Sequence, residues 1–147
     1  TPTVRRFAAV LALIGLSACT DYRPRGVSAH DAWLRPTTPG ATSAALYVRI
    51  DNHSPVSDAL VDGSAPPCMV LSVHVTTTDS SGVAVMGEPT AHATEIAPGG
   101  RLDLQPQGLH LMCYGLAGAL VSGDSFDVTL HFREAGSVVV RAVVDDR

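Results

Sequence analysis

Short apolar runs alternate with turn-forming clusters along most of the chain. From Val27 onward, clusters rich in Gly, Pro, Asp, Asn and Ser recur about every eight to twelve residues, as in RPTTPG, DNHSP, TDSSG and VSGD. The runs between them are rich in Val, Leu and Thr, as in AALYVRI, VLSVHVTT and SVVVRAVV, and none keeps a helical period. This pattern predicts an all-β domain, a β-sandwich of the immunoglobulin type with about seven to nine strands.

Alternation within CMVLSVHVT and LHLMC predicts which side chains face the core. His74 in the first run, and His110 and Met112 in the second, have the parity opposite to that of the leucines. They are predicted to point away from the core, with His110 and Met112 on the same face of one strand. The residues of the other parity, predicted to face the core, are Met69, Leu71, Val73, Val75, Leu109, Leu111 and Cys113.

Composition fits one extracytoplasmic domain and no nucleic-acid partner. The chain has 147 residues, of which 46% are hydrophobic, enough for a single core. Its basic residues are all arginine, with no polybasic run to bind nucleic acid, and its formal net charge is −4.

The N-terminal residues are typical of a targeting segment. Arg5 and Arg6 precede the apolar run Phe7 to Leu16, which is too short to span a bilayer, and LSAC follows, ending at Cys19. A leucine and small residues before a cysteine resemble the lipobox of bacterial lipoproteins. That resemblance implies lipidation at Cys19 and anchoring to the outer face of the cell membrane, or a periplasmic location.

The resulting domain boundaries are a signal peptide at 1–18, a lipidated tether at 19–26 and the folded domain at 27–147. The alternative is an ordinary secretory signal cleaved after Ala18. Both interpretations place the protein outside the cytoplasm.

His110 and Met112 are candidate metal ligands, since residues two apart on a strand project from the same face. A soft thioether beside an imidazole suits copper(I) better than magnesium, calcium or zinc. His74 points outward on its own strand, and the turn TTTDSSG predicts a returning strand that brings Met86 beside it. Each residue alone fits packing or solvation, but the four together suggest a copper site.

The chain resembles the periplasmic copper chaperone family often written PCuAC, whose members carry a histidine, a methionine about a dozen residues later and a His-x-Met pair. DAWLR, AALYVRIDN, VHVTTTDSSGVAVM and IAPGGRLDLQPQGLHLM occur in that family's order, over about Val27 to Val144. The resemblance implies a cupredoxin-like β-sandwich that binds one copper(I) ion through His74, Met86, His110 and Met112. It further implies a monomer, not an enzyme, that delivers copper toward the CuA centre of cytochrome c oxidase, with oxidase subunit II or a Sco-type thiol protein as acceptor.

Some positions depart from the family pattern. Val75 and Ala84 stand where many members have methionines, and the segment between Met86 and His110 is about two residues longer than is usual. None of these departures removes a predicted ligand, but the longer loop around GEPTAHATE leaves the approach of Met86 open.

Cys68 and Cys113 remain as a pair once Cys19 is lipidated. A disulfide suits an oxidising compartment, although alternation sends Cys113 inward and Cys68 outward unless the strand begins after Cys68. Two separate thiols, or a redox or ligand role, are the alternatives.

Two other functions remain open at this stage. One is a blue-copper-like electron-transfer protein that uses the thiolate of Cys113, and the other is a metal-independent surface lipoprotein that binds a partner protein. Trp33 is predicted to be a core aromatic residue. The histidines not predicted to be ligands are His30, His53, His92 and His131.

Overall fold

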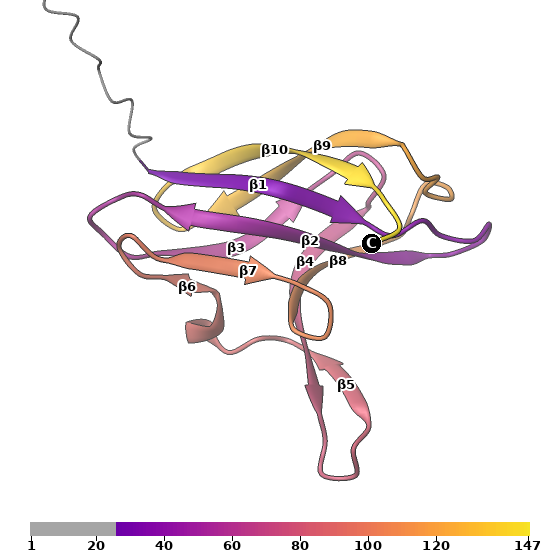
Figure 1. The fold of residues 1–147 in the computed structure, drawn as a ribbon, viewed down its shortest axis with the longest axis horizontal. Helices are drawn as coiled ribbons and strands as arrows, with labels where there is room; N and C mark the ends of the chain where they lie inside the picture. Colours follow the sequence, from indigo (N-terminus) through magenta and orange to yellow (C-terminus); the bar gives the residue numbers. More distant parts are fainter. Residues whose placement is uncertain (1–25) are drawn as a thin grey trace, which may run out of the picture.

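The computed structural model describes residues 26–147, which form a β-structure with one short 3-10 helix (Figure 1). No helix in this part of the chain is long and apolar enough to cross a membrane. The strands are β1 (Val27–Leu34), β2 (Ser43–Asn52), β3 (Asp58–Ser64), β4 (Val70–Thr78), β5 (Ala84–Gly87), β6 (Glu95–Ile96), β7 (Arg101–Leu104), β8 (Leu109–Tyr114), β9 (Ser125–Phe132) and β10 (Gly136–Val144), and the helix is η1 (Ala91–Thr94).

The sheet closes on itself. Its strands follow the order β5-β4-β8-β2-β1-β10-β9-β3-β6, β7 pairs with β2, and a further pairing of β3 with β4 completes a ring. The ring contains β4, β8, β2, β1, β10, β9 and β3, and only its β1–β10 pairing is parallel. The all-β expectation is confirmed, but a closed barrel replaces the predicted two-layer sandwich. In the closed ring, each of the seven strands pairs with a neighbour on both sides. An open sheet would leave one edge of each outermost strand unpaired.

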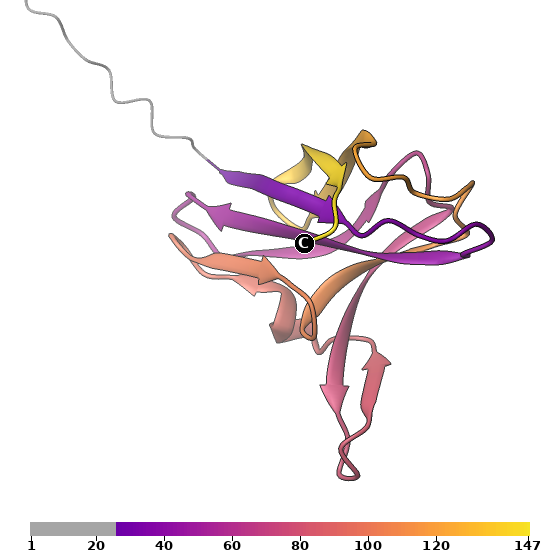
Figure 2. The ribbon, with the colours of Figure 1, turned by 45° about the vertical axis from the view of Figure 1, so that its right-hand side comes forward.

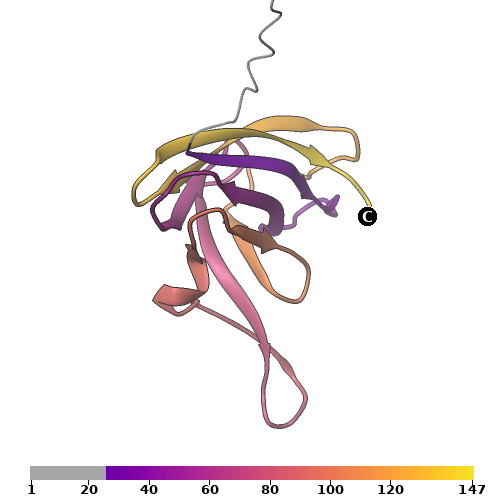
Figure 3. The same cartoon turned by 60° about the vertical axis from the view of Figure 1, so that its left-hand side comes forward.

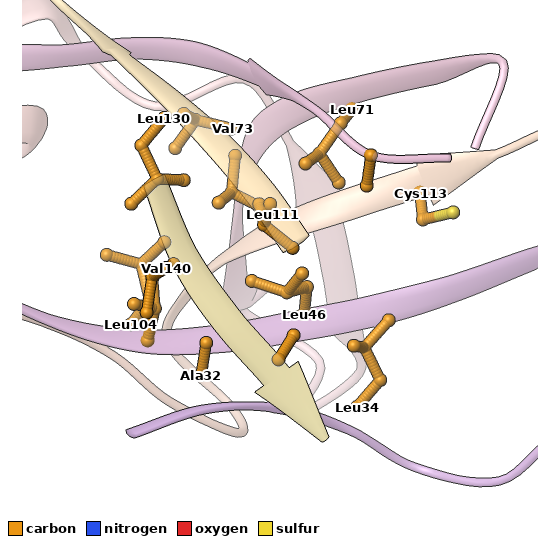
Figure 4. Close-up of a cluster of buried hydrophobic side chains, with 14 of the residues drawn as sticks. Ala32, Leu34, Leu46, Leu71, Val73, Leu104, Leu111, Cys113, Leu130 and Val140 are labelled. Atoms are coloured by element: carbon orange, nitrogen blue, oxygen red, sulfur yellow. The ribbon is translucent and has the colours of Figure 1, made fainter. Parts of the chain in front are cut away.

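The core fills the inside of the barrel (Figure 4). Alternate residues of the barrel strands β2, β8 and β9 face it, and Leu46, Leu111 and Leu130 on these strands are fully buried there. Burial of these side chains is the main favourable term in folding. The opposite parity of the same strands forms the outer face of the barrel.

The alternation predicted for β4 and β8 is confirmed for Leu71, Val73, Leu111 and Cys113, which are buried. It is wrong for Met69, which is 84% exposed because it precedes β4 and lies at the end of the barrel. Its side chain covers Gly115, where an added Cβ would lie 2.7 Å from the Met69 sulfur. The two other predicted core residues, Val75 and Leu109, are partly buried.

Cys68 and Cys113 are joined by a disulfide, with Cα atoms 5.3 Å apart. Cys68 lies in a turn before β4, where its N–H donates to the Ala65 carbonyl, so strand alternation does not govern its direction. The bond ties this turn to β8, the strand that carries His110. In the loop-closure model, a link across 45 residues stabilises the fold by about 4 kcal/mol.

A hairpin formed by the end of β4 and β5 projects from the barrel (Figures 1 and 2). β5 pairs only with β4, and all four of its residues are exposed. The chain then returns through η1 to the barrel, as Figure 3 shows from another side. Met86 is therefore carried on an element held to the barrel by one neighbouring strand.

Candidate metal centre

The pairing of β4 with β8 places two candidate ligands side by side. His74 lies directly opposite His110, and Ser72 lies directly opposite Met112. The centroids of the two imidazole rings are 6.3 Å apart. An ion bonded at about 2 Å to one nitrogen of each ring needs centroids about 5 to 6.5 Å apart. The two rings are thus spaced to share one ion.

Both methionines of the predicted site lie on the same face as the histidines. Met112 is two residues beyond His110 on β8. On the other side of β4, Met86 lies opposite Thr76, which is two residues beyond His74. Opposite residues of an antiparallel pair project from the same face, so the four side chains leave one outer face of three neighbouring strands. Met112 is partly buried, whereas Met86 is 47% exposed.

His110 points away from the core as predicted, yet only 3% of it is exposed. The Tyr47 ring, projecting from β2, has its centroid 6.4 Å from that of His110. The His110 Nδ1–H donates to the Gly108 carbonyl at 3.0 Å, which in a neutral imidazole leaves Nε2 unprotonated. Nε2 is buried and has no hydrogen-bond partner among the described residues. A buried acceptor without a partner is costly, and a metal ion would satisfy it.

His74 is partly buried and differs from His110 in its partner. Its Nε2 lies 3.1 Å from the Ser72 hydroxyl, and the edge of the Tyr114 ring packs on it at a centroid distance of 5.6 Å. A surface pocket of about 390 Å³ reaches His74, with Asp62, Ser72 and Glu88 among its lining residues. The histidine is therefore reachable from solvent.

Sequence reasoning missed the aromatic residues around the histidines. Trp33, predicted to lie in the core, instead stacks on Tyr47 at 4.7 Å on the outer face, with the Arg147 guanidinium 5.5 Å from its ring centre. The one sequence feature that could have indicated an aromatic residue beside the histidines is the parity of Tyr47 within AALYVRI, which places its side chain on the outer face. Nothing local indicated that Tyr114 would reach across to His74.

The other histidines have polar partners of their own, and Asp62, the partner of His131, also lines the pocket that reaches His74. His30, His53, His92 and His131 contact Asp51, Ser28, Glu95 and Asp62, respectively. Within residues 26–147, no group of three or more His, Cys, Asp or Glu side chains could hold a metal ion.

The disulfide also bears on the blue-copper alternative. Cys113 is fully buried and bonded to Cys68, so its sulfur is not a thiolate. A blue-copper centre requires a cysteine thiolate. The bonded form of this protein has none to offer from either described cysteine.

The resemblance to PCuAC proteins seen in the sequence is confirmed by comparison with known proteins. Residues 27–144 match the profile of the putative lipoprotein LpqE-like family, and the chain belongs to that family. Among curated protein sequences, none matches.

Three solved structures share the fold. The apo PCuAC domain from PmoF1 is 23% identical, covers 86% of this chain and 98% of its own, and has a TM-score of 0.64. The copper-bound PCuAC domain from PmoF2 is 22% identical, with coverages of 86% and 97% and a TM-score of 0.63. The solution structure of CuI-DR1885 from Deinococcus radiodurans is 28% identical, with coverages of 87% and 83% and a TM-score of 0.59.

Proposed function

We propose that this protein is an extracytoplasmic copper(I) chaperone that binds one ion through His74, Met86, His110 and Met112. The observation that carries the proposal is the buried, unpartnered Nε2 of His110, whose ring lies opposite His74. Met112, on the same face, supplies a soft donor two residues away. Two structural neighbours are copper-bound, the PCuAC domain from PmoF2 and CuI-DR1885, and they support copper as the cargo.

The ligand set explains how such a protein binds copper and also releases it. Two imidazoles and two thioethers are neutral, so binding depends on soft-donor coordination and not on charge. Thiolates bind copper(I) more strongly, so an acceptor with cysteines can remove the ion. Met86 is exposed on the projecting hairpin, where an incoming ligand can replace it first. The protein catalyses no reaction in this role.

The proposed location is the outer face of the cell membrane, with the protein anchored as a monomer by a lipid on Cys19. The signal peptide at 1–18 and Cys19 lie outside the described residues, and the LpqE-like lipoprotein family supports the proposal. The hairpin projects away from the start of β1 (Figure 2). An anchor before β1 would therefore leave the copper site facing away from the membrane. The proposed delivery is toward the CuA centre of cytochrome c oxidase, through subunit II or a Sco-type thiol protein.

A copper(I) competition titration tests the site on the chain from Thr20 onward, which contains the whole barrel. The wild type is expected to bind one equivalent, and His110→Ala and Met112→Ala to bind at least about tenfold more weakly, the effect of about 1.4 kcal/mol. Met69→Ala is the matched control, because Met69 is an exposed methionine that is not a predicted ligand and whose side chain packs on Gly115. Equal binding by all four proteins, or by none, would show that the site is not a copper site.

A further inference from the structure

The two histidines of the proposed site differ in the state of Nε2. In His110 this atom has no hydrogen-bond partner. In His74 it lies 3.1 Å from the hydroxyl of Ser72, two residues earlier on β4. One ring is thus free to accept an ion, and the other is engaged by a neighbouring side chain.

The position of Ser72 determines where the His74 ring points. Ser72 lies directly opposite Met112 in the β4–β8 pairing. The hydrogen bond draws Nε2 of His74 toward Ser72, and the ring lies toward β8, the strand of Met112, with its centroid 5.6 Å from that of Tyr114 and 6.3 Å from that of His110. An ion bonded to the Met112 sulfur would approach His74 from that side, so Nε2 is the atom placed to bind it.

We propose that Ser72 is a positioning residue that occupies the copper-binding nitrogen of His74 in the metal-free protein and gives it up when copper binds. This inference rests on the proposed function. In the His74 tautomer that carries its proton on Nδ1, the Ser72 hydroxyl donates to Nε2. On loading, the hydroxyl stops donating, and the freed lone pair binds the ion. Ser72 lines the surface pocket beside His74, so its hydroxyl can then bond to water.

The exchange of copper for the Ser72 hydroxyl at Nε2 of His74 favours release of the ion. When copper leaves, the hydrogen bond re-forms, and Nε2 of His74 is not left without a partner. The metal-free protein is stabilised and copper affinity is lowered by the same amount, because the bond exists in only one of the two states. His110 has no such partner, so its Nε2 needs no exchange before it binds the ion.

Copper(I) competition titrations of Ser72→Ala and Ser72→Thr test this role. Ser72→Ala is expected to bind copper about twofold to tenfold more tightly than wild type, the value of one net hydrogen bond, and to release it more slowly to a dithiol chelator by a similar factor. Ser72→Thr keeps the hydroxyl and should behave as wild type. Ser28→Ala is the matched control, because it removes another Ser–His contact, at 2.9 Å from His53, away from the site.

Nitrogen-15 NMR at fixed pH supplies a readout that a general structural role would not produce. The His74 Nε2 resonance should differ between wild type and Ser72→Ala without copper and coincide in the loaded proteins. Weaker binding by Ser72→Ala would mean that the serine orients His74 to bind through Nδ1, and unchanged binding would mean that it does not compete. Either result overturns the proposal while the copper site stands. If the wild type binds no copper, the proposed function fails, and the role of Ser72 fails with it.

Discussion

At the scale of single residues, the His110 ring combines one nitrogen that is hydrogen-bonded with one that has no partner. Its ring is buried, one nitrogen donates to the Gly108 carbonyl, and the other has no partner. The unpartnered buried nitrogen lowers the unfolding free energy by about 1 to 3 kcal/mol. The hydrogen bond of the other nitrogen and the packing of the ring raise it by a similar amount. A residue kept only for packing would not carry this cost.

The substitution His110→Leu separates binding from packing. We expect the copper-free variant to lose no more than about 1 kcal/mol of unfolding free energy, because the unpartnered nitrogen disappears with the hydrogen bond. The measurement is urea unfolding without copper. The neighbouring core substitution Leu111→Ala is the contrast and should cost about 2 to 5 kcal/mol. A similar loss in both variants would make His110 a structural core residue.

Strand alternation explains why some residues of the site could be predicted and others could not. Alternation depends only on the chain's own period, so His74, His110 and Met112 were assigned to the outer face correctly. The burial of His110 depends on Tyr47 from β2, which lies far away in the sequence. The contact of Ser72 with His74 depends on side-chain rotamers, about which the sequence pattern carries no information.

At the scale of elements, the β4–β5 hairpin determines where Met86 lies. Its turn is held by Asp79, whose Oδ1 accepts hydrogen bonds from the Ser81 hydroxyl and from the N–H groups of Ser81 and Val83. The Ser81 hydroxyl, followed by these N–H groups, lowers the pKa of Asp79 below its ordinary value. The charged carboxylate is therefore the form that holds the turn.

We expect Asp79→Ala to weaken copper binding by about twofold to threefold without changing any ligand, because a looser turn spreads the positions of Met86. Copper(I) competition at neutral pH measures the effect, and Met86→Ala sets its upper limit. Because the folded-state pKa is lowered, the carboxylate's contribution is complete above the ordinary value of 3.8 and is lost as the pH falls through the lowered value. An affinity equal to that of wild type would show that strand pairing alone positions Met86.

Element order was the part of the fold that the sequence could not supply. Turn signals separate the strands, but they do not indicate that β3 pairs with β4 as well as with β9. That pairing joins positions such as Gly63 and Leu71, and an added Cβ at Gly63 would meet Leu71 Cδ2 on β4 at 3.0 Å and the Thr129 carbonyl oxygen on β9 at 2.9 Å. The glycine permits this close approach between strands, and closure of the ring turns the expected sandwich into a barrel.

At the scale of the whole molecule, the barrel fixes the strands of the candidate site, and the hairpin exposes one of its candidate ligands. The disulfide and the ring of seven strands hold β4 and β8 in register, while the hairpin extends one ligand into solvent. Three of the four candidate ligands therefore lie on the rigid wall, and Met86 lies on its least supported extension. Such an arrangement can keep the three candidate ligands of the barrel in place and leave the Met86 side of the site open to an acceptor.

Copper binding should consequently appear as stabilisation of the entire fold, because the ion bridges strands that separate on unfolding. With free copper(I) buffered at about one hundred times Kd, linkage adds about 2.7 kcal/mol, which raises Tm by about 10 °C for a domain of this size. Thermal unfolding followed by circular dichroism measures the shift, which His110→Leu should reduce by about half or more and Met69→Ala should retain. An unchanged Tm in the wild type would instead favour the metal-independent binding module, since a ligand that binds the folded state must stabilise it.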